Sequence, residues 1–170
     1  VKIGYSGAKP TAGQTVQLKV TGVGTSQVPN DAKAVVLNVT GTDAADGFVT
    51  VWPCGTPQPN ASNLNLTAQT SANLVVSKIG AGGLVCLFTE AGTNLIADIN
   101  GYMPSTSTYV SVVPERLIDT RSGAKPGGGS VVQVQVAGAG ATKVPADAEA
   151  VVLNVTATAA DRGGFATVWP

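Results

Sequence analysis

The sequence predicts an all-β protein: an antiparallel β-sandwich of about seven strands, the size of an immunoglobulin domain, followed by part of a second copy of the same module. Short runs rich in β-branched and apolar residues alternate with turns rich in Gly, Pro, Asn and Asp. No window of a dozen residues shows the period of a helix. In addition, residues 34–40 and 47–53 recur almost unchanged as 150–156 and 164–170.

The first copy contains seven candidate strands. The first alternates cleanly, with Val16, Leu18 and Val20 on one face and polar residues on the other, which indicates a strand half-buried on a core. The second is apolar on both faces apart from Asn38, so we expect it to be central in its sheet. The second and third strands flank a turn rich in Gly and Asp, which is the pattern of a β-hairpin. The expected strands span residues 15–20, 34–40, 48–52, 62–66, 74–79, 84–88 and 95–102.

A weaker repeat occurs within the first copy. The three strands between residues 35 and 66 resemble, in order and spacing, the three between residues 74 and 99. Two similar three-stranded layers packed face to face give a sandwich. A trefoil would need three such units and a propeller at least four blades, so this pattern favours the sandwich.

The repeat also predicts the domain organisation. Residues 1–103 are expected to form the only complete module, residues 104–109 a polar linker, and residues 110–170 an incomplete module with counterparts of the first three strands. Such a half-module would expose apolar faces and strand edges. Further chain, a neighbouring copy or the complete module could cover them. We expect chain continuation or head-to-tail association rather than docking within the chain, and therefore an extended fibre or repeat array.

The composition excludes several classes of function. Charged residues make up only 12% of the chain, and the ten basic and ten acidic residues cancel. Without a run of like charge, binding to nucleic acid or to an anionic membrane is not expected. No apolar run approaches the roughly 20 residues of a membrane span. Low charge with many Thr and Asn favours a secreted protein, whose signal peptide we expect to have been removed or to lie outside this sequence.

The chain contains two cysteines, Cys54 and Cys86, each beside or within a predicted strand. In a β protein of low charge, one such pair is best interpreted as a disulfide formed outside the cytoplasm. Two buried free thiols are the alternative. Because the chain has no histidine, two cysteines alone cannot supply the usual four-ligand zinc site, and no cofactor is expected.

No combination of residues predicts catalysis. Ser6-Gly-Ala-Lys9 and Ser122-Gly-Ala-Lys125 have the Ser-x-x-Lys spacing of acylating enzymes, but the Gly after each Ser and the Pro after each Lys oppose the helix that this chemistry needs. The usual general base, histidine, is missing. Asp43 and Asp46 are the closest carboxylates in the first copy, but the second copy does not keep them, which indicates a solvated turn.

Two aromatic residues form the only candidate binding surface for sugars. Phe48 and Trp52 share one face of a predicted strand, with Thr50 between them. If this face points outward the rings could stack on a carbohydrate, whereas outward-facing Val49 and Val51 would place the rings in the core. The low aromatic content, 5%, favours the core.

An acidic residue in the last predicted strand suggests a junction between the copies. Asp98 lies in an otherwise apolar stretch, where an unpaired carboxylate would be costly. It could accept hydrogen bonds from turn amides or pair with Arg116 or Arg121, which flank Asp119 at the start of the second copy. A Lys–Asn or Lys–Asp isopeptide cross-link at Asn38, Asn100 or Asp98 is a further alternative.

Several motifs together resemble a known repeat. Pro114-Glu-Arg-Leu-Ile-Asp-Thr-Arg121 leads into Ala150-Val-Val-Leu-Asn-Val-Thr156, and the first copy adds Trp52-Pro-Cys-Gly55, Ser62-Asn-Leu-Asn65 and Asp98-Ile-Asn-Gly-Tyr102. This pattern resembles a repeat of secreted and surface proteins of actinobacteria and other bacteria, and it covers nearly the whole chain. Residues 1–5 depart from it, because they do not keep the lead-in motif.

The resemblance implies a module without enzymatic activity, repeated in long surface proteins or attached to secreted hydrolases. We therefore expect a structural, extracellular repeat module of a bacterial surface protein, fibre or filament, whose partners are neighbouring modules or other copies of itself. The second hypothesis is a carbohydrate-binding accessory module of a secreted hydrolase.

Overall fold

The computed structural model describes residues 7–25, 28–140 and 144–170. Within these residues the chain is almost entirely strands and loops, with seven strands and two short 3₁₀ turns. The strands are β1 (Gln14–Lys19), β2 (Ala34–Thr42), β3 (Gly47–Pro53), β4 (Leu64–Leu66), β5 (Ser71–Lys78), β6 (Leu84–Thr89) and β7 (Asn94–Met103). The turns are η1 (Ala81–Gly83) and η2 (Thr120–Ser122).

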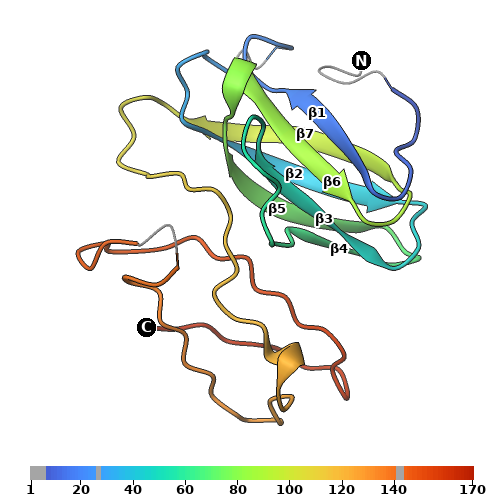
Figure 1. The fold of residues 1–170 in the computed structure, drawn as a ribbon, viewed down its shortest axis with the longest axis vertical. Coiled ribbons are helices and arrows are strands. Elements are labelled where there is room, and N and C mark those ends of the chain that lie inside the picture. Colours follow the sequence, from blue (N-terminus) through green and yellow to red (C-terminus); the bar gives the residue numbers. More distant parts are fainter. Residues whose placement is uncertain (1–6, 26–27, 141–143) are drawn as a thin grey trace.

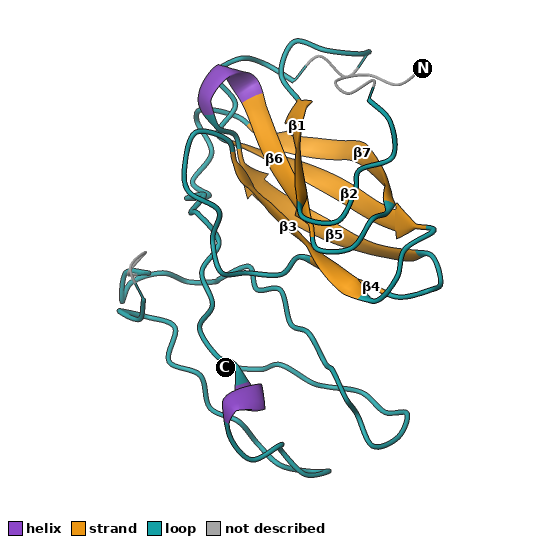
Figure 2. Ribbon diagram, turned by 45° about the vertical axis from the view of Figure 1, so that its right-hand side comes forward, coloured by secondary structure: helices purple, strands orange, loops and turns teal. Residues whose placement is uncertain are grey.

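The strands form two antiparallel sheets (Figures 1 and 2). One sheet has four strands in the order β1-β6-β3-β4, and the other has three in the order β5-β2-β7. The predicted all-β sandwich is therefore confirmed. The expected central position of the second strand is also confirmed, because β2 pairs with β5 on one side and β7 on the other.

Two details of the predicted topology are wrong. The second and third strands do not form a hairpin, because β2 and β3 belong to different sheets. The layers are also not the two consecutive trios of strands, since β2 leaves the first trio and β6 leaves the second. The physical reason is that the apolar faces of β2 and β3 pack on each other across the sandwich instead of lying side by side in one sheet.

The core lies between the two sheets. Strand alternation points every second residue of β2 and β3 inward, where these side chains are fully buried. Strand β6 adds Val85 and Leu87 from the four-stranded sheet, and β5 adds Val75 from the other. Each such side chain stabilises the fold by roughly 1.5–3 kcal/mol relative to exposure. The buried residues of β2 and β3 in this cluster are Val35, Leu37, Val39, Val49 and Val51.

The chain after β7 has a different character. Among the described residues from 104 to 170, the structure has the turn η2 and one isolated bridge between Ala137 and Val144, but no strand. Figure 2 shows this part as loops lying beside the sandwich. We refer to residues 110–170 as the second copy.

The second copy nevertheless repeats turn contacts of the first. The Gly138 N–H donates to the Val144 carbonyl at 2.8 Å, as the Gly22 N–H donates to the Val28 carbonyl at 2.9 Å. Both glycines have positive φ, 73° and 63°, which glycine adopts without strain. These local turns therefore form without the sheets that accompany them in the first copy.

Candidate functional site

The candidate aromatic residues lie on the outer face of the four-stranded sheet. Since Val49 and Val51 point into the core, alternation along β3 places Phe48 and Trp52 on the opposite side of the sheet. Across the strand pair, Trp52 lies opposite Cys86 of β6. These aromatics therefore do not lie in the core between the sheets, although Trp52 is buried, as expected for a core residue, in a second apolar cluster.

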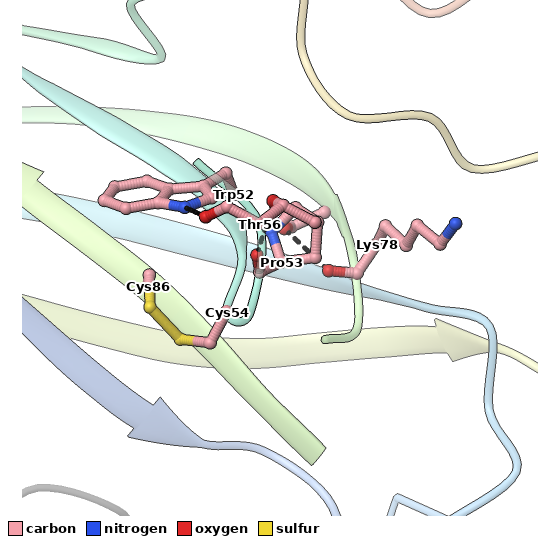
Figure 3. Close-up of a disulfide and its surroundings, with 7 residues drawn as sticks. Trp52, Pro53, Cys54, Thr56, Lys78 and Cys86 are labelled. Atoms are coloured by element: carbon pink, nitrogen blue, oxygen red, sulfur yellow. Dashed lines mark hydrogen bonds between the residues drawn. A yellow bond between two sulfur atoms is a disulfide. The ribbon is translucent and has the colours of Figure 1, made fainter. Parts of the chain in front are cut away.

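A disulfide joins Cys54 and Cys86, as predicted, with their Cα atoms 5.1 Å apart. That separation is typical of a disulfide. The bridge links the residue after β3 to the middle of β6, and it forms a second, smaller apolar cluster with Trp52. Figure 3 shows the indole ring of Trp52 beside this bridge.

The ring of Trp52 is enclosed although it faces away from the main core. Only 5% of the residue is exposed. Its indole N–H donates to the carbonyl of Thr56 at 3.1 Å, and the Thr56 hydroxyl donates to the carbonyl of Pro53 at 3.0 Å (Figure 3). The loop after β3 thus folds back over the ring. Trp52 cannot present its face to a sugar without opening this loop.

The same loop is fastened to β3 at two further points. The buried Thr50 hydroxyl donates to the Ala61 carbonyl at 2.6 Å, and the Val51 N–H donates to the side-chain oxygen of Asn63 at 2.7 Å. Of the aromatic surface, the half-buried rings of Phe48 and Phe88 remain, with centroids 5.9 Å apart and planes tilted by 45°. This is a small apolar feature rather than a stacking platform.

Asp98 is not placed at the junction between the copies. It lies on the exposed side of β7, opposite Asn38 of β2, and forms no ion pair among the described residues. Because strand β7 alternates between half-buried and exposed residues, the carboxylate reaches water and needs no charged partner. The structure therefore separates Asp98 from the two arginines considered as its partners.

The remaining candidate residues form a local cluster. Asp119 accepts from Arg116 Nη1 at 2.9 Å and from Arg121 Nη2 at 2.6 Å, and it also accepts from the Arg121 backbone N–H at 3.1 Å. These hydrogen bonds, first those from Arg121, hold the pKa of the Asp119 carboxyl well below its usual range, and the carboxylate raises the pKa of Arg121. The cluster braces the turn η2. Being exposed, it contributes little to global stability.

The two copies touch elsewhere, through asparagines. Asn154 of the second copy donates from its side-chain amide to the Ser62 carbonyl at 2.7 Å. Its side-chain oxygen accepts from Asn73 of β5, also at 2.7 Å, and Asn73 donates to the Asn63 carbonyl as well. The contact bridges the edge strand β5 and the residues before β4. The only sequence signal for it was Asn154 within the otherwise apolar run 150–155.

The linker between the copies and the first residues of the second copy also pack on the first copy. The Lys33 ammonium donates to the Ser107 carbonyl at 3.1 Å, and the Ser111 hydroxyl donates to the Lys33 carbonyl at 3.3 Å. Ser105 adds a hydrogen bond to Asp31 at 2.7 Å. The chain leaving β7 is therefore held against the end of the sandwich.

The residues with enzyme-like spacing have structural contacts. Ser6 lies outside the described residues, while Lys9 donates to the main-chain carbonyl of Asp43 at 2.7 Å. Lys125 makes the equivalent contact with the Ala159 carbonyl at 3.2 Å. The Asp43 carboxylate accepts from Asn94 at 2.8 Å. These groups hold turns, and their arrangement does not bring a nucleophile to a base.

A shallow depression of about 270 Å³ lies at the end of the sandwich near the disulfide. Its lining includes Cys54, Val113 and residues 78–81, with Lys78 as its charged member. Its volume is below that of typical ligand pockets. Within the described residues, no group of His, Cys, Asp or Glu side chains is arranged to hold a metal. The part of the chain that the structure describes has no helix long and apolar enough to cross a membrane.

Comparisons of the chain with protein-family models, with curated proteins and with solved structures found no match.

Proposed function

We propose that this chain is a non-catalytic structural repeat, in which consecutive copies of a β-sandwich module stand in a fixed relation and space an extracellular array or filament. The observation that carries the proposal is the contact of Asn154 with Asn73 and Ser62. It joins a residue of the repeated segment to the edge of the preceding module. A repeat protein whose copies contact their neighbours has the organisation of a one-dimensional array.

Two further features support an extracellular, bacterial surface location. The disulfide Cys54–Cys86 is of a kind that persists in oxidising compartments. The motifs of residues 114–121 and 150–156 resemble a repeat of bacterial secreted and surface proteins. The partners that we propose are further modules of the same kind, in the same chain or in another copy joined head to tail.

The second candidate, a carbohydrate-binding accessory module, has weaker support. It depended on the face shared by Phe48 and Trp52, and Trp52 is covered by its own loop. The half-buried rings of Phe48 and Phe88 are the remaining feature in its favour. Because replacing Trp52 would also damage the fold, Phe48→Ala is the better probe for sugar binding.

Electron microscopy with light scattering, performed alongside a glycan array on the intact protein, tests the proposal. The structural function predicts extended particles or linear assemblies and no selective sugar binding. Selective binding at micromolar concentration that Phe48→Ala abolishes, while the fold is kept, would favour the carbohydrate-binding module instead.

A further inference from the structure

Strand β7 contains an asparagine that is followed directly by a glycine. Asn100 is the only asparagine of the sequence in this position. The main-chain nitrogen after an asparagine can attack the carbonyl carbon of that asparagine's side chain. A Cβ atom on the following residue crowds this approach, and glycine has none. The pair Asn100–Gly101 is therefore the place in the chain where such an attack meets the least steric hindrance.

The main chain at this pair is only partly held by the sheet. Strand β7 has a neighbour on one side, β2, and lies at the edge of the three-stranded sheet. In this pairing Gly101 lies opposite Val36 and Ile99 lies opposite Leu37, so Asn100 has no counterpart in β2. It is the extra residue of a β-bulge, where the ladder of hydrogen bonds is locally disrupted. The main chain around Asn100 can therefore rotate more easily than that of a paired central strand.

The side chain of Asn100 is also free to turn. It is exposed, and among the described residues no hydrogen bond holds its amide. By contrast, Asn94 donates to the Asp43 carboxylate at 2.8 Å, and Asn63 accepts from the Val51 N–H at 2.7 Å. The space on the other side of the bond is open as well, since no atom lies within 4 Å of where a Cβ of Gly101 would be.

We propose that Asn100–Gly101 is a self-modification site at which the folded chain deamidates. The Gly101 nitrogen attacks Cγ of Asn100 and closes a five-membered succinimide ring. The proton of that nitrogen passes to water, and the side-chain nitrogen leaves as ammonia. Water then opens the ring at either carbonyl, which gives aspartate or isoaspartate at position 100. One water is consumed and one ammonia is released, so the reaction needs no cofactor or second protein.

The product differs from the original chain in charge and in main-chain length. It carries one more negative charge on a chain of formal net charge zero, two positions from the exposed Asp98. Charge on an edge strand opposes pairing with the edge of another sheet. Isoaspartate also adds a methylene group to the main chain, which displaces residues 101–103 from their partners in β2. The reaction depends only on the first copy, so it stands apart from the proposed function.

Mass spectrometry of the intact protein after incubation at mildly alkaline pH tests this proposal. We expect a gain of about 1 Da, from replacement of NH₂ by OH, confined to the peptide that contains Asn100. Fragmentation that distinguishes aspartate from isoaspartate should find both. Gly101→Ala is the matched variant, because the open space there accepts a methyl group without disturbing the fold. It should slow the reaction at least about tenfold.

The same chain unfolded in urea gives the rate without any restraint from the sheet. We expect the folded chain to react within about tenfold of that rate, because the bulge leaves the pair accessible. A larger protection in the folded chain would overturn the proposal, since the sheet would then hold the pair. Equal rates in the unaltered chain and in Gly101→Ala would also overturn it, as would a faster mass gain at another asparagine.

Discussion

Asn73 donates a hydrogen bond from its side-chain amide to the side-chain oxygen of Asn154 at 2.7 Å, although 81 positions separate the two residues in sequence. Asn154 returns a hydrogen bond to the Ser62 carbonyl. Each amide therefore has a partner in the neighbouring copy, and the directionality of these bonds sets how the second copy meets the edge of the sandwich.

Removing a core leucine should affect the two copies unequally. Leu37→Ala should lower the free energy of unfolding by about 2–5 kcal/mol, because it leaves a cavity in a closed core. The matched change Leu153→Ala should leave the same transition almost unchanged, because that side chain is already half exposed. Urea unfolding followed by the buried Trp52 measures both. Equal destabilisation would show that residue 153 belongs to the cooperative core.

Reducing the disulfide should destabilise the sandwich. Cys54 and Cys86 are separated by 32 positions. Closing such a loop lowers the entropy of the unfolded chain, which stabilises the folded state by roughly 3–4 kcal/mol. We expect reductant to lower the free energy of unfolding by about that amount. A chain with Cys54→Ala and Cys86→Ala serves as the control, since it should start at the lower stability and not respond to reductant.

A methyl group at Gly80 should be strongly destabilising. A Cβ atom there would lie 2.2 Å from the Cys54 carbonyl oxygen and 2.3 Å from the Cys54 nitrogen, and backbone atoms cannot move aside easily. Gly80→Ala should therefore cost about 1–3 kcal/mol or more by overpacking. Gly101 has no atom within 4 Å of such a Cβ, so Gly101→Ala is the matched control and should be nearly neutral by thermal unfolding.

The carboxyl of Asp119 should titrate at unusually low pH. Its pKa is lower in the folded chain than the reference value near 3.9. The ion pairs of Asp119 therefore stabilise the folded chain fully at pH values above the reference pKa, and this stabilisation is lost as the pH falls through the lowered pKa. The carboxyl ¹³C shift should show this midpoint, and Arg121→Gln should raise it toward the reference. A midpoint near 3.9 in the unaltered protein would contradict the hydrogen bonding of the η2 turn.

Local sequence patterns predicted the strands because alternation depends only on neighbouring residues. Val16 and Leu18 alternate with polar residues, and the apolar residues around Asn38 place β2 in the middle of its sheet. The disulfide was predictable for a similar reason, since two cysteines beside strands leave one pairing.

The arrangement of the strands was harder to predict. A strand can bury its apolar face equally well whether the next strand along the chain lies beside it in the same sheet or packs on it from the opposite sheet. The β2–β3 connection was therefore misassigned as a hairpin. The alternation of side chains along a strand also placed Phe48 and Trp52 on one face of β3, but it does not indicate which face of the strand points into the core between the sheets. The ring of Trp52 is buried by a loop whose Thr56 main-chain carbonyl accepts a hydrogen bond from the indole N–H. Patterns of side chains in the sequence do not predict such a main-chain contact.

A structural repeat requires that its successive copies keep a fixed separation, and a distance measurement tests this most directly. Spin labels at the exposed positions Asp46→Cys and Glu149→Cys, with the native disulfide closed, report the separation by pulsed electron resonance. We predict one narrow population of distances between the labels. Asn154→Ala should broaden it, because this change removes two hydrogen bonds worth about 0.5–1.5 kcal/mol each. Asn100→Ala, at another exposed asparagine, is the control and should leave the distribution unchanged. A broad distribution in the chain with Asn154 intact would contradict the proposed function.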